Sequence, residues 1–109
     1  MTEDEQITEG SANVFADLGL PDADELLAKA DLALAITRRI AERGLTQSDA
    51  ARLLRTTQPR ISDLARGRLD RFSIDTLLRL LVRLGVDVEL RFAPKREKAA
   101  RVRVVDPAA

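Results

Sequence analysis

The chain has 109 residues, about the length of one small domain, so we expect a single hydrophobic core. Its 18 basic and 18 acidic side chains cancel, and 45% of the residues are apolar, which is typical of a folded protein rather than a disordered one. The sequence contains no cysteine or histidine, so disulfides, thiol catalysis, cysteine-bound metals and the commonest general base are excluded. We therefore expect a binding protein without a cofactor rather than an enzyme.

The charge is distributed unevenly along the chain. Residues 1–35 carry nine carboxylates and one lysine, a net charge of −8, whereas residues 36–109 carry 17 basic and 9 acidic groups, a net charge of +8. Between residues 38 and 71, nine arginines stand against four carboxylates, which predicts a surface that binds a polyanion; a solvated helical face is the alternative. The absence of tyrosine and tryptophan removes the usual stacking platforms of proteins that bind RNA and single strands.

Nothing in the sequence predicts a membrane span or a secretory leader. The longest apolar run, residues 77–82, is interrupted by Arg79 and is far shorter than the roughly 20 residues that a span requires. The acidic residues 1–9 differ from the basic start of a signal peptide. We therefore expect a cytoplasmic protein that does not bind membranes.

Residues 1–44 predict an acidic arm followed by two helices. Residues 1–10 are polar and acidic and are expected to form a mobile arm, followed by a short helix over residues 11–18. Apolar residues at helical spacing predict a longer helix over residues 22–43, opened by Asp22 and Glu25 and ended by Gly44. Helix capping accounts for the carboxylates of residues 22–25 without a bound metal ion.

Three more helices are predicted, and each is opened by a hydroxyl side chain that can cap its first turn. Thr46 precedes a helix of about two turns. Thr57 precedes a helix that Gly67 ends, and Ser73 precedes an almost entirely apolar helix that Gly85 ends. We expect the last of these helices to lie in the core.

After Gly85 the hydrophobic period changes from 3.6 to 2. Val86, Val88, Leu90 and Phe92 alternate with charged side chains, which predicts a half-buried β-strand. Residues 101–105 predict a second, weaker strand. The apolar face and unpaired edge of the first strand suggest that it builds or supports a two-fold dimer; pairing within one subunit is the alternative.

The two short helices after Thr46 and Thr57 are joined by a three-residue turn and flanked by longer apolar helices, which predicts a helix-turn-helix core. Counted from Gln47, the fifth, eighth, fifteenth and eighteenth residues must touch between the two helices; they are Ala51, Leu54, Ile61 and Leu64. The segments that carry a resemblance to the Cro/repressor-like (XRE) helix-turn-helix family are Leu45-Thr46-Gln47, Gln58-Pro59-Arg60-Ile61-Ser62 and Arg66-Gly67.

This resemblance covers about residues 36–85 and implies a mainly α, Cro/repressor-like helix-turn-helix domain, to which the alternation after Gly85 adds an expected C-terminal β-strand or hairpin. We expect an acidic N-terminal arm with a short helix at residues 1–21, the helix-turn-helix domain at residues 22–85, and a β element and tail at residues 86–109. The resemblance also implies that the helix after Thr57 enters the major groove of DNA while the preceding helix lies across the backbone.

Specific roles follow from the resemblance, residue by residue. Gln58, Arg60 and Asp63 are expected at base edges, Gln58 being suited to adenine N6 and N7. The residues expected at phosphates are Gln47, Arg55, Thr57, Ser62, Arg66, Arg68 and Arg71. Arg55 stands where the family often has glycine, so a left-handed conformation at this turn would be strained.

A second, narrower resemblance covers nearly all of residues 11–93. Segments 13–22, 43–47, 58–59, 67–69, 72–73 and 84–88 look like those of HigA-type antitoxins with an XRE domain. The resemblance implies a repressor of its own operon that neutralises a RelE/HigB-like ribonuclease toxin encoded beside it. Because such toxins present basic surfaces, we expect contact with the acidic residues 1–35, with Phe15 and Leu18 as apolar anchors.

Two other functions fit the same residues. A stand-alone XRE-type repressor would share the DNA-binding residues and lack a toxin, and the neighbouring reading frame distinguishes it. A protein-interaction module with this fold would not read DNA at all, and a gel shift on the gene's own upstream DNA distinguishes that case.

Overall fold

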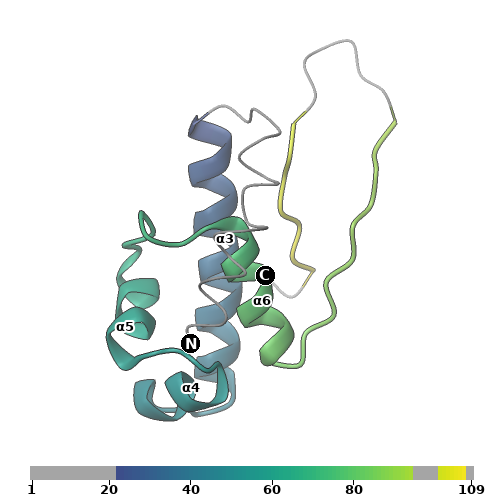
Figure 1. The fold of residues 1–109 in the computed structure, drawn as a ribbon. Helices are drawn as coiled ribbons and strands as arrows, with labels where there is room; N and C mark the ends of the chain where they lie inside the picture. Colours follow the sequence, from purple (N-terminus) through teal and green to yellow (C-terminus); the bar gives the residue numbers. More distant parts are fainter. Residues whose placement is uncertain (1–21, 95–100, 108–109) are drawn as a thin grey trace.

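The computed structural model describes residues 22–94 and 101–107. In these residues the regular structure consists of four helices, α3 (Asp22–Glu42), α4 (Gln47–Leu53), α5 (Gln58–Arg66) and α6 (Ile74–Arg83) (Figure 1). They are the four helices predicted between residues 22 and 85, so the mainly α fold is confirmed. The helix predicted at residues 11–18 lies outside the described residues, as do Phe15 and Leu18.

The three predicted hydroxyl caps are present. The side chains of Thr46, Thr57 and Ser73 each accept a hydrogen bond from the backbone N–H three residues later, at 3.0, 3.4 and 3.1 Å respectively. At α4 the contact is reciprocal, because the Asp49 carboxylate accepts a hydrogen bond of 3.4 Å from the backbone N–H of Thr46. Such a capping box satisfies N–H groups that the first turn of a helix leaves unpaired, so local sequence fixes where these helices begin.

All four helices end in the same type of backbone turn, in which a left-handed residue follows the last helical turn. Glycine fills that position after α3, α5 and α6, with φ between 65° and 83°. After α4 the residue is Arg55, whose φ is 57°. The N–H of Arg55 donates to the Arg52 carbonyl at 3.3 Å, and the N–H of Thr56 donates to the Ala51 carbonyl at 2.9 Å. The strain expected at Arg55 is present, since a left-handed residue with a Cβ costs about 1–2 kcal/mol.

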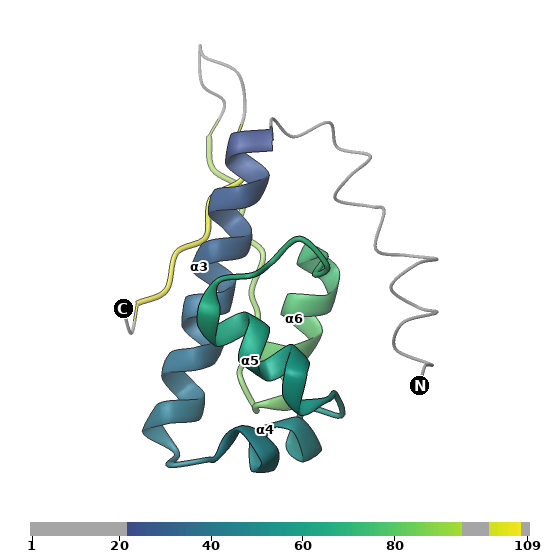
Figure 2. The same ribbon diagram turned by 90° about the vertical axis from the view of Figure 1, so that its left-hand side faces the viewer.

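The core lies where α3 packs against α5 and α6, and α4 packs against α5. The residues predicted to join the two short helices are all buried: Ala51, Leu54, Ile61 and Leu64. Phe72, in the loop between α5 and α6, is also buried, although helical periodicity does not predict it. Figure 2 shows α5 crossing in front of α3, on the outer surface of the bundle. The packing therefore fixes one face of α5 and leaves the other to solvent.

The predicted C-terminal β-strand is wrong for the chain as described. Segment 86–94 extends from the end of α6 towards the N-terminal end of α3, and segment 101–107 runs back in the opposite direction (Figure 1). In the described residues of these two segments, no backbone hydrogen bond joins one to the other, so neither is a β-strand. The alternation of apolar and charged residues favours an extended backbone, but a strand also requires a neighbouring strand to pair with it.

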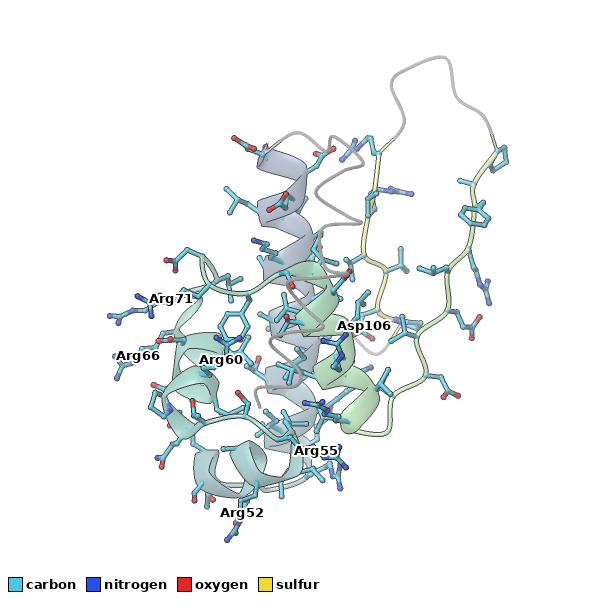
Figure 3. The ribbon with its side chains drawn as sticks, in the orientation of Figure 1. Arg52, Arg55, Arg60, Arg66, Arg71 and Asp106 are labelled. Carbon is cyan, nitrogen blue, oxygen red and sulfur yellow. The ribbon has the colours of Figure 1, made fainter. Side chains whose placement is uncertain are left out.

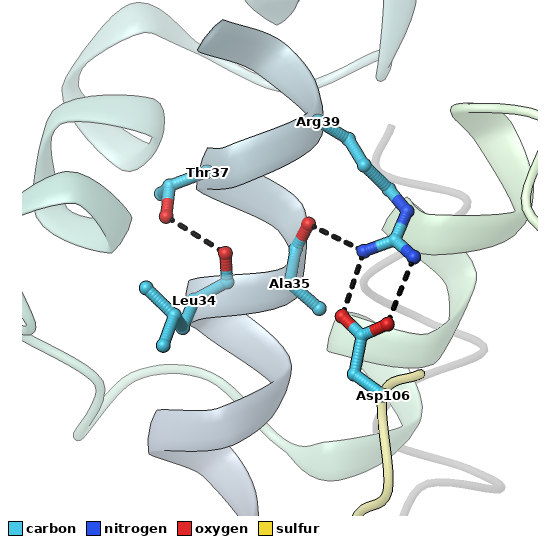
Figure 4. Close-up of polar contacts among 5 residues, drawn as sticks. All are labelled: Leu34, Ala35, Thr37, Arg39 and Asp106. Carbon is cyan, nitrogen blue, oxygen red and sulfur yellow. Dashed lines mark hydrogen bonds and ion pairs between the residues drawn. The ribbon is translucent and has the colours of Figure 1, made fainter. Parts of the chain in front are cut away.

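The segment 101–107 is held to α3 by one ion pair. Arg39 donates from Nη1 and Nη2 to the two carboxylate oxygens of Asp106, at 2.9 and 3.1 Å, and Nη1 also donates to the Ala35 carbonyl at 3.0 Å (Figure 4). The hydrogen bonds that Arg39 donates to the Asp106 carboxylate raise the pKa of Arg39 above its ordinary value. A two-point contact of this kind fixes both position and orientation, so the segment lies at a defined distance from the helix.

Candidate nucleic-acid interface

The outer face of α5 is polar. Ile61 and Leu64 point into the core, and at 100° per residue this places Pro59, Ser62 and Arg66 on the opposite side of the helix. Pro59 and Arg66 are exposed, and Ser62 is half-buried. The same two buried residues that anchor α5 therefore determine which side chains it presents to a ligand.

Gln58 occupies the first position of α5, directly after the Thr57 cap. Its side chain is exposed and makes no hydrogen bond to any described residue. The primary amide, which offers two donors and one acceptor oxygen, is therefore available to an external partner. Asp63, which is also expected at a base edge, is half-buried on the flank of the same helix.

Arg60, which is expected at a base edge, is half-buried rather than freely exposed. Its guanidinium lies over the ring of buried Phe72, with its central carbon 4.2 Å from the ring centroid. Stacking of this kind is worth about 0.5–2 kcal/mol and ties α5 to the loop before α6. Arg60 therefore has a partner within the protein, and a base contact would have to be made from the stacked position.

Exposed arginines surround α5 and the start of the helix-turn-helix unit. Figure 3 shows Arg66 and Arg71 pointing away from the body beside α5, and Arg52 pointing away from α4. The exposed arginines of this region are Arg52, Arg55, Arg66, Arg68 and Arg71. Gln47 and Thr57, also expected at phosphates, are exposed at the starts of the two helices. The fold thus gathers the predicted side chains around one helix.

Arg52 is absent from the residues predicted to contact phosphates. It donates to the Asp49 carboxylate at 2.6 Å, three residues earlier on the same helix. Both side chains are well exposed, so the pair contributes little to stability and leaves the Arg52 guanidinium accessible. Helical spacing could have predicted its exposure, because Arg52 lies about one turn after the exposed residues at the start of α4.

Other arginines of the basic region are used within the protein. Arg43 donates to the Leu84 carbonyl at 3.2 Å, and Arg83 donates to the Leu54 carbonyl at 2.9 Å. These two arginines join neighbouring elements through backbone oxygens, whereas Arg39 joins α3 to segment 101–107 through the Asp106 carboxylate. The surplus of arginine in the sequence is therefore divided between two roles, and only the exposed members remain for a polyanion.

The arrangement favours recognition over chemistry. The polar side of α5 is a protruding helix bearing an amide and surrounded by guanidinium groups, and a single α-helix fits the major groove of duplex DNA, which is about 12 Å wide. In residues 22–94 and 101–107 there is no group of three or more side chains that could hold a metal ion. A search of the same residues finds no helix that is both long enough and apolar enough to span a bilayer.

Comparison with known proteins gives two matches. Residues 14–93 match the model of a helix-turn-helix domain family. A solved structure described as an XRE family transcriptional regulator is 40% identical to this chain and superimposes with a TM-score of 0.72. That similarity covers 79% of this chain and 99% of the other. No curated protein matches the chain.

Proposed function

Because the chain belongs to the XRE family of helix-turn-helix transcriptional regulators, we propose that it is a dimeric repressor of its own operon. In this proposal α5 reads the operator, and the protein also serves as the antitoxin of a RelE/HigB-like toxin. DNA-binding transcriptional regulation follows from the family itself. The operator contacts, the dimer and the toxin are the proposal. The observation that carries it is the exposed polar face of α5, with Gln58 at its start and arginines on either side.

The proposed docking places α5 in the major groove. Gln58 then donates to and accepts from the N7 and N6 edge of an adenine, and Pro59 packs on the methyl group of a neighbouring thymine. Asp63 and Arg60 lie further along the helix, where they contact adjoining base edges. The expected phosphate contacts fix the register of the protein on DNA and carry no sequence information. We assign them to Gln47, Arg55, Thr57, Ser62, Arg66, Arg68 and Arg71, and we include Arg52 because it is exposed on α4.

The toxin is proposed from the resemblance to HigA-type antitoxins and from charge. The first turn of α3 carries Asp22, Asp24 and Glu25, and the leucines that follow are unusually exposed, Leu26 at 61% and Leu27 at 54%. Apolar side chains beside carboxylates suit a basic protein surface, because charge steers the encounter and apolar contact holds the complex. This part of α3 extends the contact expected from Phe15 and Leu18.

The experiment for the DNA proposal is binding of the full chain to the DNA upstream of its own gene, measured by fluorescence anisotropy against random DNA of equal length. We expect a preference of at least about a thousandfold for the upstream DNA, the lower end for specific binders. Val82→Ala is the matched control, because Val82 is an exposed, uncharged helical residue on α6. Equal affinity for both DNAs would favour the protein-interaction module instead.

The toxin is tested separately. The product of the neighbouring reading frame should inhibit cell growth when expressed alone, and co-expression of this chain should restore growth. A variant with both Leu26→Asp and Leu27→Asp should fail to restore growth while keeping operator binding. A neighbouring gene without toxicity would favour a stand-alone repressor.

A further inference from the structure

The extended segment after α6 has an apolar face that the other described residues leave largely exposed. The alternate residues Val88, Leu90 and Phe92 are 38%, 72% and 95% exposed, so exposure rises steadily with distance from the core. Only Val86, at the start of the segment, packs against the core, and its N–H donates to the Leu81 carbonyl at 3.1 Å. From residue 87 to residue 94, no backbone hydrogen bond to another described residue is present. An edge of this kind is a template for pairing with another chain.

A slot lies between this segment and segment 101–107. Its floor is formed by apolar residues of α3 and α6, and the extended segments form its two walls; among these residues are Ala28, Leu32, Leu81, Val88 and Val104. Because both walls are extended backbone without a partner strand, an occupant must supply backbone donors and acceptors as well as apolar side chains. An extended polypeptide supplies both.

We propose that the occupant is segment 86–94 of a second copy of this chain, paired antiparallel with its counterpart and centred on Leu90. This inference rests on the dimer in the proposed function and specifies its interface. In this register Leu90 lies opposite the partner's Leu90, Val88 lies opposite the partner's Phe92, and Glu89 lies opposite the partner's Arg91. One face of the pair is then entirely apolar, and the other carries two symmetric ion pairs.

Neighbouring registers are less favourable for identifiable reasons. Centring the pair on Glu89 or on Arg91 keeps the apolar face but places two like charges directly opposite each other, which is destabilising. Shifting one strand by a single residue places charged residues opposite apolar ones and moves charged side chains into the apolar face. Within one chain Glu89 and Arg91 already form an ion pair of 3.2 Å, so their side chains point to the same face, as this register requires.

Two-fold symmetry fills both slots at once. Each copy contributes segment 86–94 to the slot of the other, so the order across the sheet is 101–107 of one copy, 86–94 of the second, 86–94 of the first and 101–107 of the second. The bidentate contact between Arg39 and Asp106 holds the outer segment in place as the far wall. Exposed Arg101 and Arg103 then lie on the outer strand, where charge discourages addition of a further strand. The assembly therefore closes at two copies.

Single cysteines test the register, because the natural sequence has none. Directly opposite residues in an antiparallel pair have Cβ atoms about 4.5–5.5 Å apart, near the separation that a disulfide needs, whereas diagonal neighbours are about 7–8 Å apart. Under mild oxidation of the full-length variants, Leu90→Cys should give a covalent dimer. Glu89→Cys and Arg91→Cys should cross-link poorly alone and well when the two are mixed. Val82→Cys on α6 is the exposed control and should stay monomeric in denaturing gels.

A charge exchange provides an independent measurement. Glu89→Arg and Arg91→Glu should each raise the dimer dissociation constant about tenfold, and the double variant should restore it, since the two opposite pairs are re-formed with reversed polarity.

Self-cross-linking strongest at residue 89 or 91 would overturn the register. A dimer in sedimentation that cross-links at none of these positions would overturn the interface and leave the proposed function intact, whereas a monomer at tens of micromolar would remove the dimer itself.

Discussion

Arg83 donates a hydrogen bond of 2.9 Å to the carbonyl oxygen of Leu54, and this contact joins the last turn of α6 to the turn between α4 and α5. Leu54 is the C-terminal cap of α4, where backbone carbonyls lack helical partners. The contact therefore sets where the strained residue Arg55 and the start of α5 lie relative to the core. We therefore expect Arg83 to affect DNA recognition through the position of α5 rather than through a contact with DNA.

We expect Arg83→Met to lower the free energy of unfolding by about 1.5–3 kcal/mol, the range for a hydrogen bond to a charged group. Methionine keeps much of the side-chain volume and removes the donors. Operator affinity should fall as α5 loses its fixed position, with the dependence on salt unchanged. Thermal unfolding and binding at several salt concentrations test this, with Val82→Ala as the control. Unchanged stability with a smaller salt dependence would instead make Arg83 a phosphate contact.

Arg55 combines backbone strain with an exposed positive charge. Replacing it with glycine should raise the free energy of unfolding by about 0.5–1 kcal/mol, because relief of the left-handed strain exceeds the added entropy of the unfolded chain. The same change should weaken binding to operator and random DNA alike and reduce the salt slope by about one. Arg55→Asn, which tolerates this conformation, is the matched variant and should weaken binding to the same extent. A destabilised Arg55→Gly protein would contradict this explanation.

Arg60 and Gln58 are both expected at base edges, but replacing them should affect the free energy of unfolding differently. Arg60→Ala removes the stack on Phe72 and should lower the free energy of unfolding by about 0.5–2 kcal/mol. Gln58→Ala should leave stability unchanged, because the exposed amide has no partner among the described residues. Urea unfolding of both variants measures this, with Ile61→Ala as the buried reference at about 2–5 kcal/mol. Equal effects of Arg60→Ala and Gln58→Ala on stability would argue against the stack.

The capping box at α4 predicts a pH dependence. Hydrogen bonding to Thr46 holds the pKa of the Asp49 carboxyl below its ordinary value of 3.8. Because the folded pKa is lower than the unfolded one, the ionised form stabilises the folded state above the unfolded pKa, and this contribution is lost as the pH falls through the folded pKa. Asp49→Asn should therefore cost stability at neutral pH and progressively less below 3.8. If Asp49→Asn lowers the free energy of unfolding by the same amount at neutral and acidic pH, this explanation is contradicted.

Sequence patterns predict the local features of this protein well. The caps at Thr46, Thr57 and Ser73 and the spacing of Ala51 and Ile61 depend on residues within one or two turns, and all are present in the structure. Contacts between distant residues could not be read in the same way. Arg39 meets Asp106 across 67 positions, and Arg83 meets Leu54 across 29, so nothing in the periodicity of either helix points to them.

The C-terminal segment shows a second limit of structure prediction from the sequence. Alternation of Val86, Val88, Leu90 and Phe92 with charged residues correctly indicates extended backbone with one apolar face. It does not specify which chain pairs with that backbone, because strand formation depends on a neighbour as well as on the residues themselves. At α5, likewise, the pattern places Arg60 on the correct helix, and only the fold brings Phe72 beneath it.

The most direct measurement of the central claim is the affinity of wild-type and Gln58→Ala proteins for a set of operators in which each base pair is replaced in turn. If α5 reads DNA through Gln58, the wild-type protein loses about 1–3 kcal/mol at one adenine position, and Gln58→Ala loses its preference at that position while retaining the others. A folded Gln58→Ala protein with the wild-type preference at every position would show that α5 does not read the operator through this residue.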